Sequence, residues 1–235
     1  MVENSKGKSL VIIGAGGFGR EVKWLIERIN QYAAETSGKG VWNFLGFIDD
    51  GMKPGTEIGS SVVLGGCEWL DKYGEDIYAA CAVGAAGTRE TILRKIQNNP
   101  KIHFPNLVDP SVLCSGSVSM GQGNIICAGT IFTVDIQIGD FCIINLDCTL
   151  GHDVKMEDFV TVYPGVNVSG KVTIGRRSEI GTGTKIIQDK RISSGVIIGA
   201  GSIVIHDISE NCTAVGCPAR PIKYHKPVSD EEKDK

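Results

Sequence analysis

A six-residue register that runs without a gap from Val108 to Ser209 constrains the fold of this chain more than any other feature. The segment divides into seventeen consecutive blocks of six, and the first residue of every block is apolar. Glycine recurs at the second place, and the fifth place is mostly Val, Thr, Ser or Cys. No helix has a period of six, and an alternating strand would not place a large aliphatic residue only at every sixth position. The pattern is typical of a solenoid.

Each block of six predicts one flat side of a three-sided coil, made of a short strand and a turn. The first and fifth side chains point inward and form the core. Three blocks make one coil, so we expect five to six coils, stacked at the usual strand spacing of roughly 4.8 Å. The second half of the chain is therefore predicted to be a parallel β-helix.

The length of 235 residues leaves room for a second, smaller domain before the repeat. We expect a domain over residues 1–105, the β-helix over 106–212, and a C-terminal segment with a charged tail over 213–235. The tail from Lys226 to Lys235 lacks apolar periodicity and is expected to be disordered. A net charge of −3 and an aromatic content of 6% indicate no nucleic-acid partner.

The N-terminal segment Met1–Leu10 contains no long apolar run, so we expect neither a signal peptide nor a transmembrane helix, and a cytoplasmic protein. The eight cysteines form no CxxC pair. Cys114 opens a block, and Cys142 and Cys148 occupy fifth places, where small apolar residues belong. We expect buried free thiols, which suit a reducing compartment.

The first hundred residues predict a small Rossmann-like α/β domain. The apolar run Ser9–Ile13 is followed by the glycine-rich sequence GAGGFG and then by a helical pattern. A second expected strand, 43–48, ends in Asp49-Asp50, and a third, 77–83, ends at Gly84 before a helix over 88–97. Glycines at such a turn let backbone N–H groups approach a phosphate at the positive end of the helix.

Three interpretations of the glycine loop are open: a site for a nicotinamide dinucleotide, a site for another nucleotide, or a purely structural turn. A dehydrogenase normally needs a larger nucleotide domain and a catalytic domain with polar groups, whereas a β-helix follows here. A nucleotide-linked sugar is the interpretation we favour. The Asp49 and Asp50 carboxylates are placed to accept hydrogen bonds from its ribose or base.

Of the four histidines, His103, His206 and His225 are expected to be solvent-facing or structural. His152 differs, because it occupies the third place of its block, a turn position from which a side chain projects out of the solenoid. The adjacent Asp153 could orient the imidazole and raise its basicity. An ordinary exposed polar corner is the alternative.

From Leu150 to Pro221 the chain, with the run GHDVKMEDFVTVYPG and the closing GCPARP, resembles the bacterial nucleotide-sugar acetyltransferases, and its glycine loop and FIDD segment match their N-terminal domain. The resemblance implies a left-handed β-helix and a homotrimer with active sites between subunits. It also implies transfer of acetyl from acetyl-CoA, without a metal, to the amino group of a UDP- or GDP-linked 4-amino-4,6-dideoxyhexose.

The same resemblance assigns site residues. His152 falls on the general base and Asp153 on its supporting carboxylate. The nucleotide-sugar site falls on Gly16, Gly17, Phe18, Asp49, Asp50 and Gly84. The acetyl-CoA site falls on Asn145, Thr161, Gly170, Thr182 and Ala200. Thr161 is a departure, because some members carry a second histidine there; its hydroxyl can still donate one hydrogen bond.

Two other functions are compatible with these residues. One is an O-acetyltransferase acting on sialic acid or another small hydroxy acceptor, and the other is a non-catalytic trimeric scaffold that binds a nucleotide sugar.

Five basic side chains in the second half of the chain either meet the phosphates of acetyl-CoA or belong to a solvated face. These are Lys185, Lys190, Arg191, Arg220 and Lys223.

Overall fold

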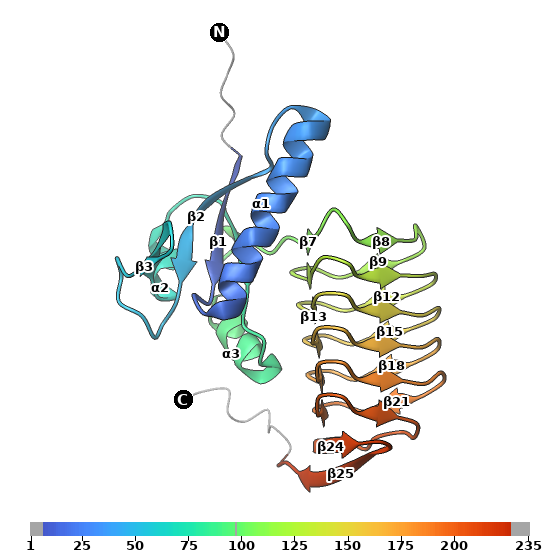
Figure 1. Cartoon of the computed structure of the whole chain (residues 1–235). Helices are drawn as coiled ribbons and strands as arrows, with labels where there is room; N and C mark the ends of the chain where they lie inside the picture. Colours follow the sequence, from blue (N-terminus) through green and yellow to red (C-terminus); the bar gives the residue numbers. More distant parts are fainter. Residues whose placement is uncertain (1–6, 97, 227–235) are drawn as a thin grey trace.

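A computed structural model describes residues 7–96 and 98–226 and shows an α/β lobe beside a three-sided solenoid (Figure 1). The lobe contains one sheet in the order β3-β4-β2-β1-β5-β6, parallel except for the β3–β4 pair. Helix α1 packs on one face of the sheet, and α2 and α3 pack on the other. The elements are β1 (Lys8–Ile13), α1 (Gly17–Ser37), β2 (Trp42–Ile48), β3 (Glu57–Ile58), β4 (Ser61–Gly65), α2 (Glu68–Lys72), β5 (Ile77–Cys81), α3 (Ala86–Ile96) and β6 (Ile102–His103).

The three strands and two helices expected in the lobe are present, with bounds that differ by a few residues. Missing from the prediction were the hairpin β3–β4, the five-residue helix α2 and the edge strand β6. Strands β3 and β6 have only two residues each. Segments this short carry too little periodicity to be recognised from the sequence.

The solenoid confirms the six-residue register. Seventeen two-residue strands, β7 to β23, each end in the residue that opens a block, and the strands from β7 to β20 pair in parallel with the strand eighteen residues further on. They are β7 (Leu107–Val108), β8 (Leu113–Cys114), β9 (Ser119–Met120), β10 (Ile125–Ile126), β11 (Ile131–Phe132), β12 (Gln137–Ile138), β13 (Ile143–Ile144), β14 (Thr149–Leu150), β15 (Lys155–Met156), β16 (Thr161–Val162), β17 (Asn167–Val168), β18 (Thr173–Ile174), β19 (Glu179–Ile180), β20 (Lys185–Ile186), β21 (Arg191–Ile192), β22 (Ile197–Ile198) and β23 (Ile203–Val204).

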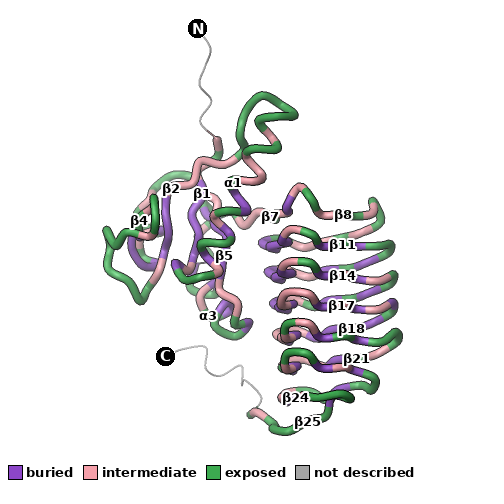
Figure 2. Tube along the Cα trace, viewed as in Figure 1, coloured by how far each residue is buried: buried purple, intermediate pink, exposed green. Residues whose placement is uncertain are grey.

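The strands form the three faces of a left-handed prism. The first face contains β7, β10, β13, β16, β19 and β22, the second face β8, β11, β14, β17, β20 and β23, and the third face β9, β12, β15, β18 and β21. We call the edge between the first and second faces the first corner and the edge between the second and third faces the second corner. Fourteen of the seventeen block-opening side chains are buried in the interior (Figure 2).

The first coil is the exception to this burial. Val108 and Met120 are only half-buried and Cys114 is exposed, because no further coil stacks above them. The expectation that the cysteines are buried is therefore wrong for Cys114, and also for Cys217 near the C-terminus. The other six are buried, and all eight are free thiols.

The fourth place of most blocks turns the corner in the left-handed backbone region. Asp135, Asp147, Asp153 and Asp189 have φ between 56° and 60° there, and glycine occupies several other fourth places. Asp and Asn tolerate this region better than most residues, and glycine adopts it freely. The conformation of Asp153 is thus part of the turn chemistry that repeats along the prism.

The lobe is fixed to the first face by buried contacts. Leu107, Ile125 and Ile143, which point outward from that face, belong to the same buried cluster as Leu25 of α1. Arg28 of α1 donates two hydrogen bonds, 2.6 and 3.0 Å long, to the Asp109 carboxylate. The position of the α/β sheet relative to the solenoid is therefore well defined.

A buried ion cluster joins α3 to the solenoid. The Glu90 carboxylate of α3, 2% exposed, contacts Arg94 on its own helix and both Arg176 and Arg177 on the solenoid. Burial opposes its charge, but the hydrogen bonds from Arg177 and Arg176 outweigh that effect and lower the pKa of Glu90 to about 2.

The solenoid ends in β24 (Cys212–Gly216), which pairs in parallel with β22, and in β25 (Ala219–Tyr224), which folds back antiparallel on β24. Most of the tail expected to be disordered lies outside the described residues. Among the helices that the structure describes, none combines the length and apolar character needed to cross a membrane.

Candidate active site

The connections of the α/β sheet place a topological switch point between β1 and β5. The chain leaves β1 through α1 to β2 on one side, and leaves β5 through α3 to β6 on the other. Ligands of open parallel sheets bind at such a switch point, outside the carboxyl ends of the strands. Two turns lie at this switch point: residues 14–17 follow β1, and residues 82–85 follow β5.

The N-terminus of α1 is open to an anion. Its N-cap residue, Gly16, makes no side-chain cap, and the first turn carries no acidic residue. A Cβ built on Gly16 would meet nothing within 4 Å, and one on Gly17 would meet only the Arg20 guanidinium, at 3.9 Å. The unpaired N–H groups of this turn are therefore accessible to a phosphate.

The glycine loop is braced from β2 by Asp49. The Asp49 carboxylate accepts one hydrogen bond from the backbone N–H of Ala15, at 2.9 Å, and another from Gly51, at 2.9 Å. Phe18, also predicted to contact the nucleotide, packs partly buried against the lobe core. Both side chains shape the loop, and contact with a ligand remains a prediction for each of them.

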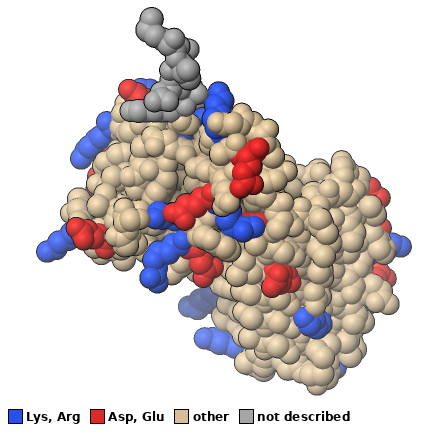
Figure 3. Space-filling view, turned by 45° about the horizontal axis from the view of Figure 1, so that its top comes forward, with Lys and Arg blue, Asp and Glu red and all other residues tan. Residues whose placement is uncertain are grey.

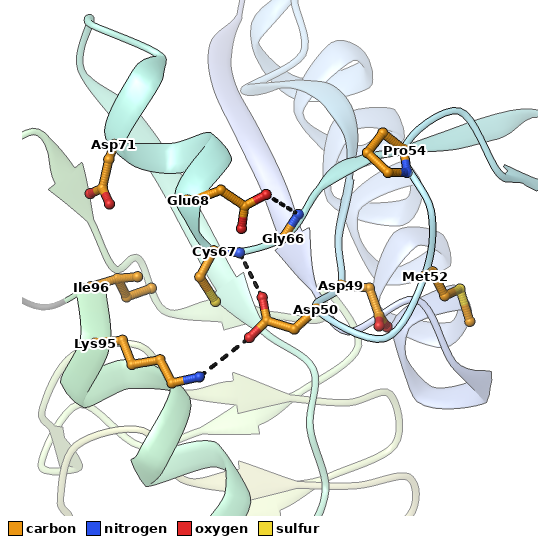
Figure 4. Close-up of a pocket in the computed structure, with 10 residues that line it drawn as sticks. All are labelled: Asp49, Asp50, Met52, Pro54, Gly66, Cys67, Glu68, Asp71, Lys95 and Ile96. Atoms are coloured by element: carbon orange, nitrogen blue, oxygen red, sulfur yellow. Dashed lines mark hydrogen bonds and ion pairs between the residues drawn. The ribbon is translucent and has the colours of Figure 1, made fainter. Parts of the chain in front are cut away.

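A hollow of about 440 Å³ opens at the carboxyl end of β2 (Figure 4). Asp49 and Asp50 line it together with Glu68, Asp71 and Lys95. The Asp50 carboxylate accepts a 2.7 Å hydrogen bond from the backbone N–H of Cys67 and pairs with Lys95 at 3.4 Å. These contacts, the Cys67 N–H first, lower the pKa of Asp50, so the hollow is lined by negative charge near neutral pH.

The turn after β5 is held on the solenoid by a buried arginine. Arg89, 1% exposed, donates six hydrogen bonds, which reach the carbonyls of Val83, Gly84, Phe141, Phe159 and Val160 and the Thr161 hydroxyl. Burial away from water lowers its pKa. Buried charge is tolerated only with such compensation, so Arg89 locks the Gly84 turn to the first face.

Thr161 lies at this junction rather than in an open groove. It is 1% exposed, and its hydroxyl donates a 2.7 Å hydrogen bond to the Gly84 carbonyl while accepting one from Arg89. A hydrogen bond from Thr161 to acetyl-CoA, as predicted from the sequence, would require this donor to leave Gly84.

Tyr163 and Glu179 also meet the Gly84 turn, and neither was identified from the sequence. The Glu179 carboxylate accepts hydrogen bonds from the Ala86 N–H at the start of α3 and from the Tyr163 phenol, both 2.9 Å long. The N-terminus of α3 is thus occupied by a carboxylate, whereas that of α1 is open. Of these two helix N-termini, the one that an anion can approach is therefore that of α1.

His152 projects from the second corner, and its side chain is 57% exposed. Nδ1 lies 2.8 Å from the Asp153 carboxylate, the contact that the sequence suggested. Because a carboxylate only accepts, Nδ1 carries the proton and Nε2 is free to act as a base. The ring lies against Gly170 of the next coil, where a Cβ would be 2.6 Å from Cε1.

The remaining predicted residues separate into two sets. Gly170 adjoins His152 at the second corner, whereas Asn145, Thr182 and Ala200 lie at the first corner. Strand β14 on the second face separates Asn145 from His152. One chain therefore does not bring all the predicted site residues together.

Charged side chains of both signs gather around the junction of lobe and solenoid, while much of the visible solenoid surface is uncharged (Figure 3). Of the basic residues considered for acetyl-CoA, Lys185 already donates to the Gly165 carbonyl, at 2.9 Å, and to the Asn167 side chain, at 2.6 Å. Its Nζ remains at the surface beside the first corner.

Comparisons with known proteins agree with this architecture. Residues 9–96 match the family model of the PglD N-terminal domain. GDP-perosamine N-acetyltransferase of Escherichia coli O157:H7 is 28% identical over 225 residues, covering 90% of this chain and 95% of that protein.

Solved structures resemble the whole described architecture. The acetyltransferase domain of PglB from Neisseria gonorrhoeae, in complex with acetyl coenzyme A, is 28% identical, with a TM-score of 0.78 and coverage of 92% of this chain and 100% of that one. PerB from Caulobacter crescentus, in complex with CoA and GDP-perosamine, is 26% identical, with a TM-score of 0.75 and coverage of 92% and 97%.

A hexapeptide prism with a polar corner histidine, joined to a nucleotide-binding lobe, defines an acetyltransferase of the β-helix superfamily. Within that class, the relatives with which this chain aligns over nine-tenths of its length are nucleotide-sugar acetyltransferases. The non-catalytic scaffold considered above is not supported, because these relatives are acetyltransferases.

Proposed function

We propose that this protein transfers an acetyl group from acetyl-CoA to the amino group of a nucleotide-linked 4-amino-4,6-dideoxyhexose. The observation that carries the proposal is the His152–Asp153 pair at the second corner, combined with an open anion site at α1. The relatives named above act on GDP-perosamine or bind it, or bind acetyl coenzyme A.

The nucleotide sugar would lie across three neighbouring strand ends. Its pyrophosphate meets the N–H groups at Gly16 and Gly17 after β1, and its nucleoside lies toward Asp49 and Asp50 after β2. The hexose then extends toward Gly84 after β5. This order takes the reactive end of the substrate to the solenoid.

His152 acts as the general base in this proposal. The sugar amine attacks the thioester carbonyl, a C–N bond forms, and Nε2 accepts the proton that the amine gives up. The C–S bond then breaks, and the leaving thiolate takes the proton back from the imidazolium. Asp153 holds the ring in the required tautomer. A base positioned in this way contributes roughly 10²- to 10⁴-fold in rate.

The sugar and the base that serves it belong to different copies of the chain. The Gly84 turn meets the solenoid beside Tyr163 at the first corner, whereas His152 is at the second corner. Positions 146 and 152 are six residues apart along the chain and lie at opposite ends of one side of the prism, a separation of at most roughly 20 Å. Bringing the first corner of one copy to the second corner of another completes the site.

Such a contact uses different surfaces on the two partners and closes into a ring. We propose a homotrimer, in line with the three-sided prism. The exposed apolar side chains Leu113 and Ile131 on the second face support this assembly, since they would be covered in it. We also propose that the trimer works in the cytoplasm, as its eight free thiols suit a reducing compartment.

The test of the base is His152→Ala, assayed by release of CoA thiol with UDP- and GDP-linked 4-amino-4,6-dideoxyhexoses. We expect kcat to fall by about 10²- to 10⁴-fold, while both substrates still bind in calorimetry. Wild-type turnover in this variant would contradict the proposed role. Faster acetylation of sialic acid than of any amino sugar would instead favour O-acetylation.

Mixing experiments test the shared site. His152→Ala lacks the base, and Gly16→Asp fills the anion site with a carboxylate, so each homotrimer should be inactive. Co-refolding the two should restore activity, because some sites combine an intact lobe with an intact histidine. No recovery in trimers shown by mass spectrometry to be mixed would place both functions in one chain.

A further inference from the structure

The outward residues of the first face change polarity where the contact with the lobe passes from α1 to the Gly84 turn and α3. The outward residues of successive coils are Ile125 and Ile143, then Thr161 and Glu179, and then Ile197. The apolar pair is buried under α1. The polar pair lies where the Gly84 turn reaches the solenoid. Thr161 and Glu179 contact the lobe through hydrogen bonds, whereas the apolar pair contacts it through apolar packing.

Glu179 determines which way the Tyr163 hydroxyl points. One carboxylate oxygen accepts the Ala86 N–H at 2.9 Å and the other accepts the Tyr163 O–H at 2.9 Å. Since the phenol proton is committed to Glu179, the Tyr163 oxygen can only accept a hydrogen bond from a further group. Partial burial, followed by the nearby Glu179 charge, raises the pKa of Tyr163 to about 12, so this proton stays in place near neutral pH.

The Tyr163 oxygen lies beside Gly84, in the turn that follows β5. A Cβ built on Gly84 would be 3.6 Å from it, and the Tyr163 side chain is all that such a Cβ would meet within 4 Å. Tyr163 also occupies the first corner, one coil after Asn145. A hexose that passes over Gly84 toward the corner therefore meets this oxygen first.

We infer that Tyr163 and Glu179 select and position the amino group of the sugar. This inference rests on the proposed function. A primary amine that attacks a thioester uses its lone pair for the new C–N bond and has two N–H groups to place. One donates to the Tyr163 oxygen, and the other gives its proton to Nε2 of His152 of a second copy. A hydroxyl has a single hydrogen and cannot serve both Tyr163 and His152, so this arrangement favours the amine.

Arg89 is the nearby positive charge, but its hydrogen bonds are taken by carbonyls and by Thr161. Arg89 holds the Gly84 turn in a fixed position on the solenoid, where the sugar would pass. Tyr163 and Glu179 are thus positioning residues in this scheme, and the reacting proton goes to His152.

Two substitutions separate positioning from mere support of the fold. Tyr163→Phe keeps the ring and removes the hydroxyl, which is both the accepting oxygen and the donor to Glu179. Glu179→Gln must keep its oxygen at the Ala86 N–H, so its amide nitrogen faces Tyr163 and donates to it. The phenol proton then points toward the sugar, and the acceptor becomes a donor that competes for the amine lone pair.

The experiment compares three ligands with wild type, both variants and the control Tyr32→Phe, whose tyrosine is exposed on α1. The ligands are the nucleotide-linked 4-amino sugar, its 4-hydroxy counterpart and the nucleoside diphosphate alone. In Tyr163→Phe, affinity for the amino sugar should fall about tenfold, as expected for one hydrogen bond to a polar group. Affinity for the other two should stay within twofold.

Glu179→Gln should lower kcat more than it raises KM, because it traps the lone pair in the bound complex. A merely structural role predicts equal losses for all three ligands, and that result would overturn the inference, as would unchanged selectivity in both variants. Failure of the wild type to acetylate any nucleotide-linked amino sugar would overturn the proposed function, and this role with it.

Discussion

Gly170→Ala tests the proposed site at the second corner and leaves the side chains of His152 and Asp153 unchanged. The three atoms closest to a Cβ at Gly170 are Nε2, Cε1 and Cδ2 of His152, with the Cε1 distance 2.6 Å. Ordinary van der Waals contact begins near 3.4 Å, so the ring must move by about 1 Å and its basic nitrogen is covered. A misplacement of that size costs about 10²-fold in rate.

The backbone should accept the change, because Gly170 is absent from the residues with left-handed φ. Gly116 provides a matched control: it occupies the same place in its block three coils of eighteen residues earlier, and a Cβ there would meet nothing within 4 Å. We expect Gly116→Ala to retain wild-type kcat and Gly170→Ala to lose about 10²-fold, with melting temperatures of both near wild type.

Non-additivity makes the test specific. If Gly170→Ala acts only by displacing the imidazole, adding it to His152→Ala should cost nothing further. Initial rates of CoA release with saturating nucleotide sugar and acetyl-CoA provide the measurement. A Gly170→Ala enzyme with wild-type kcat, or a double variant much slower than His152→Ala, would refute the reasoning.

Three further outcomes are expected. Glu90→Gln should lower stability by about 3 kcal/mol at pH 7, since a pKa of about 2 in the fold against 4.5 unfolded stabilises the native state above pH 4.5. That contribution disappears as pH falls through 2, so the denaturation midpoints of variant and wild type should converge in acid. Gly16→Asp should abolish nucleotide binding in calorimetry yet keep or raise the melting temperature, because an aspartate N-cap stabilises α1. Arg89→Met should destabilise the protein by about 3 kcal/mol or more in urea titration, since it leaves carbonyls at the lobe junction without a donor; a loss under 1 kcal/mol would mean that water replaces the guanidinium.

The solenoid could be predicted nearly residue by residue because its constraint is local and repeated. Each block opens with the side chain that must fill the interior, so the register and the strand ends follow from spacing alone. Cys114 shows the limit of this reasoning. It satisfies the pattern, but burial also requires a coil on either side, and the block pattern does not show that the first coil has no coil above it.

The site could be predicted only where neighbours in sequence are neighbours in space. His152 and Asp153 are adjacent, and the corner turn brings their side chains within 2.8 Å. Thr161 was expected to face acetyl-CoA, but whether a residue at the sixth place faces solvent or the lobe depends on how the lobe docks. Spacing within a block carries no information on that docking.

The signal that could have located the junction is in the sequence, but at a period of eighteen rather than six. Sixth-place residues point outward, and on one face they change from apolar to polar where the lobe turn meets the solenoid. That column is Leu107, Ile125, Ile143, Thr161, Glu179 and Ile197. The second face changes in the same way, from Leu113 and Ile131 to Thr149, Asn167 and Lys185, before Ile203 in its last strand. We infer that the apolar stretch of each face packs against a partner with an apolar surface. On the first face this partner is α1 of the lobe, and on the second face it would be another copy of the chain in the trimer that we propose.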